Sequence, residues 1–478
     1  MPVFFRLGQK QGSFSLAFGL FILRPMKHNK LFRETRILFP MALPLIISQI
    51  GQVSMGVVDI IMVGHYHPRA LAAVTMGSSL AFGLLLVAMG ILMALDPFVS
   101  QNFSRKKWEK CGIYAKAGLF SAIILSLPMV FLFYYSEFLF DLLRQKEEII
   151  PLGVEYLRAF IPGVFPFLIF ISFRQVLQCL GKMKAIMVVV LLTNIWNFFA
   201  NWVLIYGNLG FPEWGVWGAG LATTSSEWAM ALGVGIYAYW CPLSRRIYLY
   251  KIKKNQFLKG LKELLWIGFP IGIQLALEVW AFTATTFLMG TIGAFPLAGH
   301  QIALNLASLV FMIPVGLGAA ACVRIGHLIG QKNKESAKTC VKVTLFFSLL
   351  WSCISATSFY FIPHLLAAFY TPNQEVQNFA IQFLKVAALF QFSDGLQVVG
   401  FSILRGMGDT RHPMIFLLIG YWFLGIPFGI ISTFYIFFDP VFLWWGLVIG
   451  LSITALLLWL RIRKLLWSSL ENLPFLPY

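Results

Sequence analysis

The fold class of this protein is decided by residues 262–290, which read KELLWIGFPIGIQLALEVWAFTATTFLMG. After Lys262 and Glu263 the segment stays apolar for longer than the roughly 20 residues that a helix needs to cross a bilayer. Glu278 is the one charged residue within that apolar run. Because a charge at the centre of a membrane helix costs about 2.5–3.5 kcal/mol, such a residue is rarely kept without a use. The segment predicts a membrane-spanning helix with a functional carboxylate.

Apolar runs of this kind recur along the whole chain, which has 478 residues, 59% of them hydrophobic and 12% charged. The pattern predicts an all-α polytopic membrane protein with little chain outside the lipid and no separate soluble domain. The twelve predicted spans are residues 40–63, 72–100, 113–135, 150–177, 185–206, 216–240, 262–290, 298–325, 338–361, 376–404, 412–433 and 440–467.

Positively charged residues gather on one side of the predicted helices. In a soluble protein the net charge of +18 would favour nucleic-acid binding. Here the positions of the charged residues along the chain decide which partner is expected. If the spans alternate in direction, most of the 37 Lys and Arg residues fall in the N-terminal arm, after the even-numbered spans and at the C-terminal end. This positive-inside pattern predicts cytoplasmic termini, an even number of spans, and the lipid bilayer rather than nucleic acid as a partner.

The chain repeats itself when residue n is laid over residue n+226. Identities include Pro44 with Pro270, Gly64 with Gly290 and Lys106 with Lys332. The repeat predicts two six-helix bundles related by a pseudo-two-fold axis along the membrane normal, with substrate bound between them. The expected organisation is a cytoplasmic arm over 1–39, an N-terminal bundle over 40–241, a cytoplasmic linker over 242–261, a C-terminal bundle over 262–467 and a cytoplasmic tail over 468–478.

Several motifs together resemble the multidrug and toxic compound extrusion (MATE) transporters of the bacterial NorM type. They are the phrase P-x14-D-I-I-M-V-G from Pro44 to Gly64, the Pro97 and Gln101 pair, Gly268-Phe269-Pro270 with Glu278, the stretch AGHQIALN at 298–305 and the loop LRGMGDT at 404–410. The resemblance implies a multi-pass protein of the bacterial inner membrane, here taken as a monomer. It also implies export of cationic amphipathic compounds in exchange for sodium ions or protons.

Two alternatives stay open beside this hypothesis. A flippase for lipid-linked oligosaccharide or peptidoglycan precursor, of the same superfamily, is expected to line its cavity with arginine, whereas the predicted spans hold acids and, among interior arginines, only Arg158. A receptor or structural protein would not need a duplicated bundle. An enzyme, a cofactor and a resident metal are not expected, because Gly181-Lys182 is followed by Met183 instead of completing a phosphate-binding loop, and no H-E-x-x-H or Cys/His cluster occurs.

The candidate site of the C-terminal bundle is built on two acids. Glu278 shares a helix face with Gln274, and the resemblance places a cation-coupling glutamate at this position. Asp394 lies between Gln391 and Gln397, and at the offset of 226 it overlies an apolar leucine, so the repeat does not explain it. Sodium-coupled relatives tend to have tyrosine where this chain has Phe390, which favours coupling to protons at least as readily as to sodium. The alternative for each acid is an interhelical hydrogen bond that only stabilises packing.

The N-terminal bundle offers two further acids. Asp59 shares a face with Gln52, and the resemblance makes it a protonatable or cation-attracting group. Glu227 follows a run of Ser and Thr residues in the sixth span, and is either a counter-charge for substrate or a carboxyl kept neutral by its neighbours. Asp96 and Asp409 lie at predicted helix ends, so both are interpreted as turn or cap residues.

Overall fold

The computed structural model describes residues 30–142 and 147–467, and within these residues it contains helices and no strands. The first half consists of α1 (Lys30–Tyr66), α2 (Pro68–Met93), α3 (Leu95–Ser104), α4 (Trp108–Tyr134), α5 (Ser136–Leu142), α6 (Ile150–Cys179), α7 (Met183–Tyr206), η1 (Asn208–Gly210), α8 (Gly215–Trp240) and α9 (Pro242–Tyr248). The second half consists of α10 (Lys254–Ile292), α11 (Ala294–Gly330), α12 (Lys334–Phe361), α13 (Pro363–Tyr370), α14 (Gln374–Met407), α15 (Arg411–Leu417), η2 (Leu418–Gly425), α16 (Ile426–Ile431), η3 (Ser432–Ile436) and α17 (Val441–Trp467).

Among the described residues, eleven helices are long and apolar enough to cross a membrane. Two of them are composite, because α2 and α3 form one span over Pro68–Ser104 and the helices from α15 to η3 form another over Arg411–Ile436. The remaining predicted span coincides with α8, which lies beside α6 and α7. It is less apolar because it carries the polar run Thr223 to Glu227. The all-α fold with six spans in each half is confirmed.

Some helices begin earlier than the hydropathy pattern predicts. α1 starts at Lys30 rather than at residue 40, and α10 starts at Lys254, inside the segment predicted as a linker. The polar start of α10 is held against α4, since Gln256 donates to Glu109 (2.9 Å) and Tyr114 donates to Glu263 (2.6 Å). These contacts stabilise helix beyond the apolar run, which hydropathy alone does not detect. The predicted tail over 468–478 and most of the predicted arm lie outside the described residues.

Two matching turns support the repeat. Lys106 and Lys332, which are 226 residues apart, both have a φ of 58°, although this left-handed region is unusual for a side chain other than glycine. The same backbone hydrogen bonds close each turn, from Lys107 to Asn102 (3.0 Å) and from Asn333 to Leu328 (2.9 Å). The predicted offset is therefore visible in backbone geometry as well as in sequence.

The two halves meet through a pair of close helix contacts that the repeat also relates. A Cβ added to Gly90 of α2 would lie 2.4 Å from the Cα of Gly272 in α10, and one added to Gly316 of α11 would lie 2.6 Å from the Cα of Ile46 in α1. Gly90 corresponds to Gly316 and Ile46 to Gly272 at the offset of 226. Each contact brings two backbones together at a position where only glycine fits, so the interface is itself two-fold symmetric.

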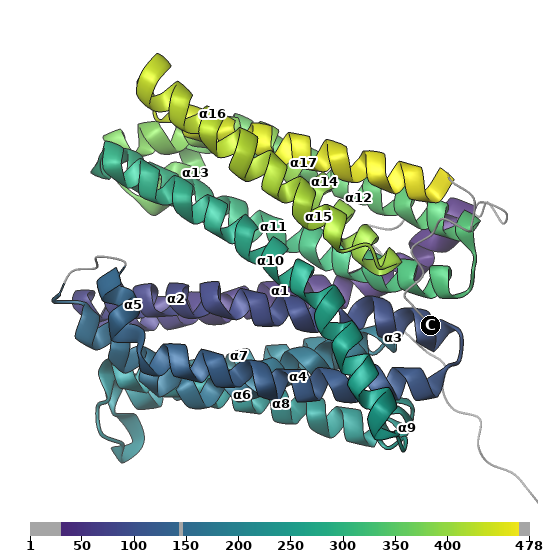
Figure 1. The fold of residues 1–478 in the computed structure, drawn as a ribbon. Coiled ribbons are helices and arrows are strands. Elements are labelled where there is room, and N and C mark those ends of the chain that lie inside the picture. Colours follow the sequence, from purple (N-terminus) through teal and green to yellow (C-terminus); the bar gives the residue numbers. More distant parts are fainter. Residues whose placement is uncertain (1–29, 143–146, 468–478) are drawn as a thin grey trace, which may run out of the picture.

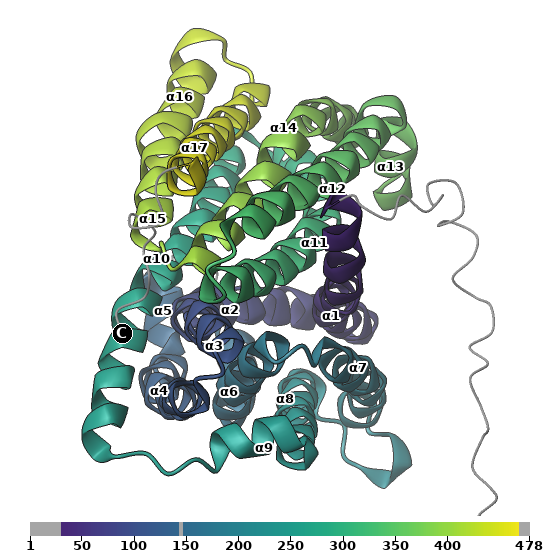
Figure 2. The same ribbon diagram turned by 90° about the vertical axis from the view of Figure 1, so that its right-hand side faces the viewer.

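The halves converge at one end of the molecule and diverge at the other (Figure 1). We call the converging end the basic end, defined by residues 105–107, 241–253, 331–333 and 408–410, where many Lys and Arg residues lie. α5 and α13 lie at the opposite end. Viewed from the basic end, α9 and the start of α10 carry the chain from the first half to the second (Figure 2).

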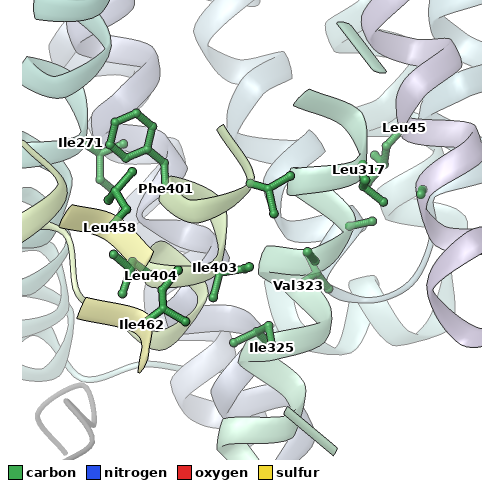
Figure 3. Close-up of a cluster of buried hydrophobic side chains, with 14 of the residues drawn as sticks. Leu45, Ile271, Leu317, Val323, Ile325, Phe401, Ile403, Leu404, Leu458 and Ile462 are labelled. Carbon is green, nitrogen blue, oxygen red and sulfur yellow. The ribbon is translucent and has the colours of Figure 1, made fainter. Parts of the chain in front are cut away.

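A hydrophobic core runs across the interface at this end. Leu45 of α1 and Leu317 of α11 belong to the same buried cluster as Ile403 and Leu458 of the second half (Figure 3). The first half has a second cluster of its own, built around residues such as Leu168. The interface and the second half therefore share one core, and the carboxylate sites described below are set into these two clusters.

Candidate functional site

The second half holds Glu278 and Asp394 close together and out of water. Glu278 lies on α10 and accepts a hydrogen bond from Nε2 of Gln397 on α14 (2.9 Å). Asp394 lies one turn before Gln397, is 4% exposed, and interacts electrostatically with Glu278. The amide oxygen of Gln397 has no hydrogen-bond partner although it is fully buried. This site therefore contains two carboxylates and an unused acceptor oxygen.

A phenol that the sequence pattern did not indicate completes this site. Tyr421, in the η2 segment, is fully buried and its hydroxyl lies 3.0 Å from the same Nε2 of Gln397. Phe390 instead contributes only carbon, with its ring 6.0 Å from those of Phe282 and Trp444. The phenol oxygen that Phe390 lacks is thus supplied from another helix, and Phe390 alone is no argument against sodium.

The two remaining candidates of this half, Gln391 and Gln274, are also buried. The Oε1 of Gln391 accepts from Ser355 (3.3 Å), while its Nε2 has no partner. Gln274 lies one turn before Glu278 on α10. Together these amides extend the polar stripe along α10 and α14, as the spacing in the sequence predicts.

In the first half, donors from two neighbouring helices surround Asp59 of α1. Asn201 of α7 donates to its Oδ1 (2.5 Å), and the hydroxyl of Thr223 of α8 lies 3.0 Å from its Oδ2. Asn197, one turn before Asn201, accepts from the amide of Asn201 (3.2 Å). Neither asparagine was predicted as a site residue, although two Asn residues four apart in an apolar helix are a detectable signal of a shared polar face.

Glu227 belongs to the same region. It lies on α8, one turn after Thr223, is buried, and interacts electrostatically with Asp59. Its Oε2 has no hydrogen-bond partner. The Ser and Thr residues beside it bond to backbone carbonyls instead, as Ser226 does to Ala222 (2.9 Å). Glu227 is therefore a second carboxyl of the first-half site.

The hydrogen-bond partner of Gln52 differs from those of Asp59. Gln52 accepts from the guanidinium of Arg174 on α6 (3.0 Å), which also donates to Gln49 (3.2 Å). Arg174 is buried within α6, so Arg158 is not the only arginine to consider inside the predicted spans. The expectation that Arg158 is an interior arginine is wrong, because Arg158 is exposed and lies over the ring of Tyr134. Arg405 and Arg324, with side chains 11% and 13% exposed, have acidic partners in the first half.

Asp96 was interpreted as a turn or cap residue, and this is wrong. It is fully buried in the first turn of α3, and its carboxylate accepts from the side chains of Gln178 (2.6 Å) and Gln175 (3.3 Å) instead of capping a helix. Arg405 of the second half lies 3.4 Å from the same carboxylate. The neighbouring Pro97 suggested a turn, and the role of Asp96 could not be predicted because its main partners lie far away in the sequence.

The two carboxylate sites lie in separate halves and can each hold a proton or a cation. No group of three or more His, Cys, Asp or Glu side chains suited to a metal ion is found in the part of the chain that the structure describes. The six cysteines are free, and five are buried, as expected for small apolar side chains.

Comparison with known proteins agrees with the motifs. The family model MatE matches residues 44–203 and again residues 270–431, so its two matches start 226 residues apart. A probable multidrug resistance protein NorM of Pasteurella multocida is 34% identical, over 92% of this chain and 97% of the relative. A multidrug resistance protein MdtK of Proteus mirabilis is 32% identical, over 91% and 96%.

Solved structures agree with the fold. A eukaryotic MATE transporter superposes with a TM-score of 0.86 at 21% identity, covering 93% of this chain and 98% of that chain. A multidrug resistance MATE family transporter in an outward-facing conformation superposes with a TM-score of 0.81 at 21% identity, covering 94% and 100%. The predicted resemblance is confirmed, and the chain belongs to the MatE family of MATE transporters.

Proposed function

We propose that this protein is a secondary active multidrug efflux antiporter, which exports cationic amphipathic compounds in exchange for protons or sodium ions. The observation that carries the proposal is the presence of a buried carboxylate site in each half, Asp59 with Glu227 in the first and Glu278 with Asp394 in the second. The names of the curated relatives support multidrug export.

The carboxylates explain how exchange would work. A cationic compound in the apolar space between helices is attracted by an ionised carboxylate, while a proton or sodium ion on that carboxylate removes the attraction. Ion and compound then compete for the same group, so each leaves when the other binds. Competition of this kind is what antiport requires, and it needs no ATP and no covalent step.

The residues of the two carboxylate sites support either protons or sodium as the coupling ion. Buried carboxyl groups that lie beside another acid favour protons, because burial and a like charge both favour the neutral form. Sodium needs several oxygen ligands, and Glu278, Asp394, Tyr421 and the free amide oxygen of Gln397 offer them in the second half. We infer that protons are used at least as readily as sodium.

The charge distribution supports an orientation in the bacterial inner membrane with the basic end and both termini in the cytoplasm. Epitope tags inserted at residues 110, 255 and 470 should then be reachable only from the cytoplasm, and tags at 145 and 436 only from outside. A tag at 255 reached from outside would reverse the proposed orientation.

Transport in inverted vesicles tests the function. The lumen of these vesicles corresponds to the cell exterior, so an exporter accumulates ethidium inside them. Accumulation is measured with an acidic lumen at constant sodium, and separately with a sodium-loaded lumen at constant pH. We expect the acidic lumen to drive uptake at least as well as sodium does, and a Glu278→Gln variant to show none. If neither gradient drives ethidium uptake by the wild-type protein, the proposal is wrong.

A further inference from the structure

An ion pair joins the two halves at the basic end. The Oδ2 of Asp96, on α3 of the first half, lies 3.4 Å from Nε of Arg405, on α14 of the second half. Asp96 is fully buried and the side chain of Arg405 is 11% exposed. Because removing two charges from water is costly, a buried pair persists only where its geometry and hydrogen bonds compensate.

Each partner is anchored in its own half. Gln178 and Gln175 of α6 hold the carboxylate from the first half, at 2.6 Å and 3.3 Å. On the other side, Nε of Arg405 lies 3.5 Å from the sulfur of Cys322 in α11. Two weaker sulfur contacts also cross the interface here, from Arg405 to Met93 (3.6 Å) and from Cys322 to the Asp96 carboxylate (3.8 Å). Separating the halves would break these contacts together with the pair, while the two glutamines stay in place on α6.

A second pair of a carboxylate and an arginine also joins the first half to the second. Glu34, at the start of α1, accepts two hydrogen bonds from the guanidinium of Arg324 on α11, both 2.9 Å long. Glu34 is 1% exposed. In both pairs the first half gives the acid and the second half gives the arginine.

Neutral hydrogen bonds add to the contact around these pairs. Gln101 donates to the carbonyl of Gly406 (3.1 Å), and Arg105 donates to the carbonyl of Gly330 (3.1 Å). A ring nitrogen of His327 lies 2.8 Å from the carbonyl of Cys179. All of these contacts join the two halves near the basic end, where the helices converge (Figure 1).

We propose that the pairs Asp96–Arg405 and Glu34–Arg324, which we call the basic-end clasp, hold this end of the transporter closed and must break for it to open. The proposal rests on the proposed function only in assuming that the halves move apart at this end during transport. Closure is then an electrostatic state in which acids of the first half are neutralised by arginines of the second. Opening hydrates all four groups, which limits its free-energy cost.

A purely structural role makes a different prediction. If the pairs only stabilise folding, weakening them would loosen each half, whereas a clasp would let two intact halves separate. Asp409 provides a matched control, since its carboxylate lies 2.8 Å from both His412 and Arg461, all within the second half at the same end. Asp409→Asn removes a similar charge without touching the interface.

Pulsed electron spin resonance on the full-length chain in lipid nanodiscs can separate the two roles. Only the exposed Cys353 is replaced by serine, because the other five cysteines are buried and Cys322 has to stay beside Arg405. Spin labels at Lys106→Cys and Lys332→Cys report the distance between the halves, because both residues are exposed and the repeat relates them. Labels at Lys106→Cys and Lys184→Cys report the integrity of the first half alone. Each pair is measured in the Asp96→Asn, Arg405→Gln, Glu34→Gln and Asp409→Asn variants.

For Asp96→Asn and Arg405→Gln we expect the ratio of long to short distances between the halves to rise at least about tenfold, since the closed state then buries an unpaired group. Glu34→Gln should shift the ratio in the same direction. Asp409→Asn should not shift it, and the distance within the first half should stay constant throughout. An unchanged ratio in both Asp96→Asn and Glu34→Gln would overturn the proposal, as would a broadened distance within the first half that accompanies every shift. Because no substrate is involved, the result is independent of whether the proposed export is correct.

Discussion

The two halves share a backbone but differ at the acids. At the offset of 226, Asp59 corresponds to Thr285, and Glu278 corresponds to Gln52. Thr285 bonds to the carbonyl of its own helix at Ala281 (3.0 Å), whereas Asp59 takes donors from two other helices. The comparison shows that the two halves share a repeated backbone. The acids of the carboxylate sites were not repeated with it, because each half carries them at positions where the other half has a neutral residue.

The partners of the acids differ as well. Asp59 is held by an asparagine and a threonine, and Glu227, which interacts electrostatically with it, keeps its Oε2 without a partner. Glu278 has one donor, Gln397, which it shares with a phenol. Each site therefore keeps buried acceptor oxygens without a partner, Oδ1 of Asn201 and Oε2 of Glu227 in the first half and Oε1 of Gln397 in the second. We expect the second half to bind the coupling ion more directly, because Tyr421 adds a phenol oxygen beside its carboxylates.

The largest expected effect follows from removing an acid of the second half. Glu278→Gln and Asp394→Asn should each reduce gradient-driven ethidium accumulation at least about a hundredfold, because a neutral isostere keeps the volume but cannot exchange an ion for a cation. Inverted vesicles measure the rate, and size-exclusion chromatography checks folding. The control is Asp409→Asn, which changes an acid outside both sites; wild-type rates in the two site variants would refute the assignment.

The first half should be less sensitive. We expect Asp59→Asn to slow accumulation about tenfold to a hundredfold, since Asn201 and Thr223 can still bond to the new amide while its charge is lost. Introducing an acid at the repeat-related position with Thr285→Asp should not restore the rate, because the Thr285 side chain bonds to Ala281 of its own helix, whereas Asp59 is bonded from α7 and α8. Recovery in the double variant would mean that the two halves are interchangeable.

A matched pair of substitutions tests whether the hydroxyl of Tyr421 is a ligand for sodium. Tyr421→Phe should reduce sodium-driven uptake about threefold to tenfold and proton-driven uptake less, since sodium loses an oxygen ligand while the carboxyl groups remain. Phe390→Tyr in that variant returns a hydroxyl to the neighbourhood and should recover part of the sodium response. Equal losses under both gradients would show that Tyr421 only supports packing.

The smallest expected effect concerns the symmetric interface. Gly90→Ala places a Cβ against the backbone of Gly272 and should lower the stability of the protein in detergent by about 1–3 kcal/mol, as overpacking does. Gly83→Ala, in the same helix α2 with open space around it, should not lower it. Thermal unfolding followed by tryptophan fluorescence compares them, and equal melting temperatures would argue against the close contact.

Much of the fold could be predicted, because hydropathy, charge distribution and the repeat offset are properties of the sequence itself. None of them requires knowing which side chains meet in the folded protein. Glu278 and Asp394 were found for the same reason, since a charge inside an apolar run stands out. Tyr421 was missed because tyrosine is common in membrane helices and only folding brings it to Gln397. The pair Asp96 and Arg405 was missed because each residue alone is typical of a helix end.

The continuous helix α10 has a mechanical consequence. Its 39 residues give a length of about 58 Å at 1.5 Å per residue, nearly twice the hydrocarbon thickness of a bilayer. The part before Pro270 is fastened to α4 through Gln256 and Glu263, and the part after it carries Glu278 in the second half. A proline inside a helix bends it, and α10 changes direction along its length (Figure 1). If the bend at Pro270 changes by about 10°, the far end, about 33 Å away, moves by about 6 Å. A small change in this bend is thereby magnified into a larger displacement at the other membrane face.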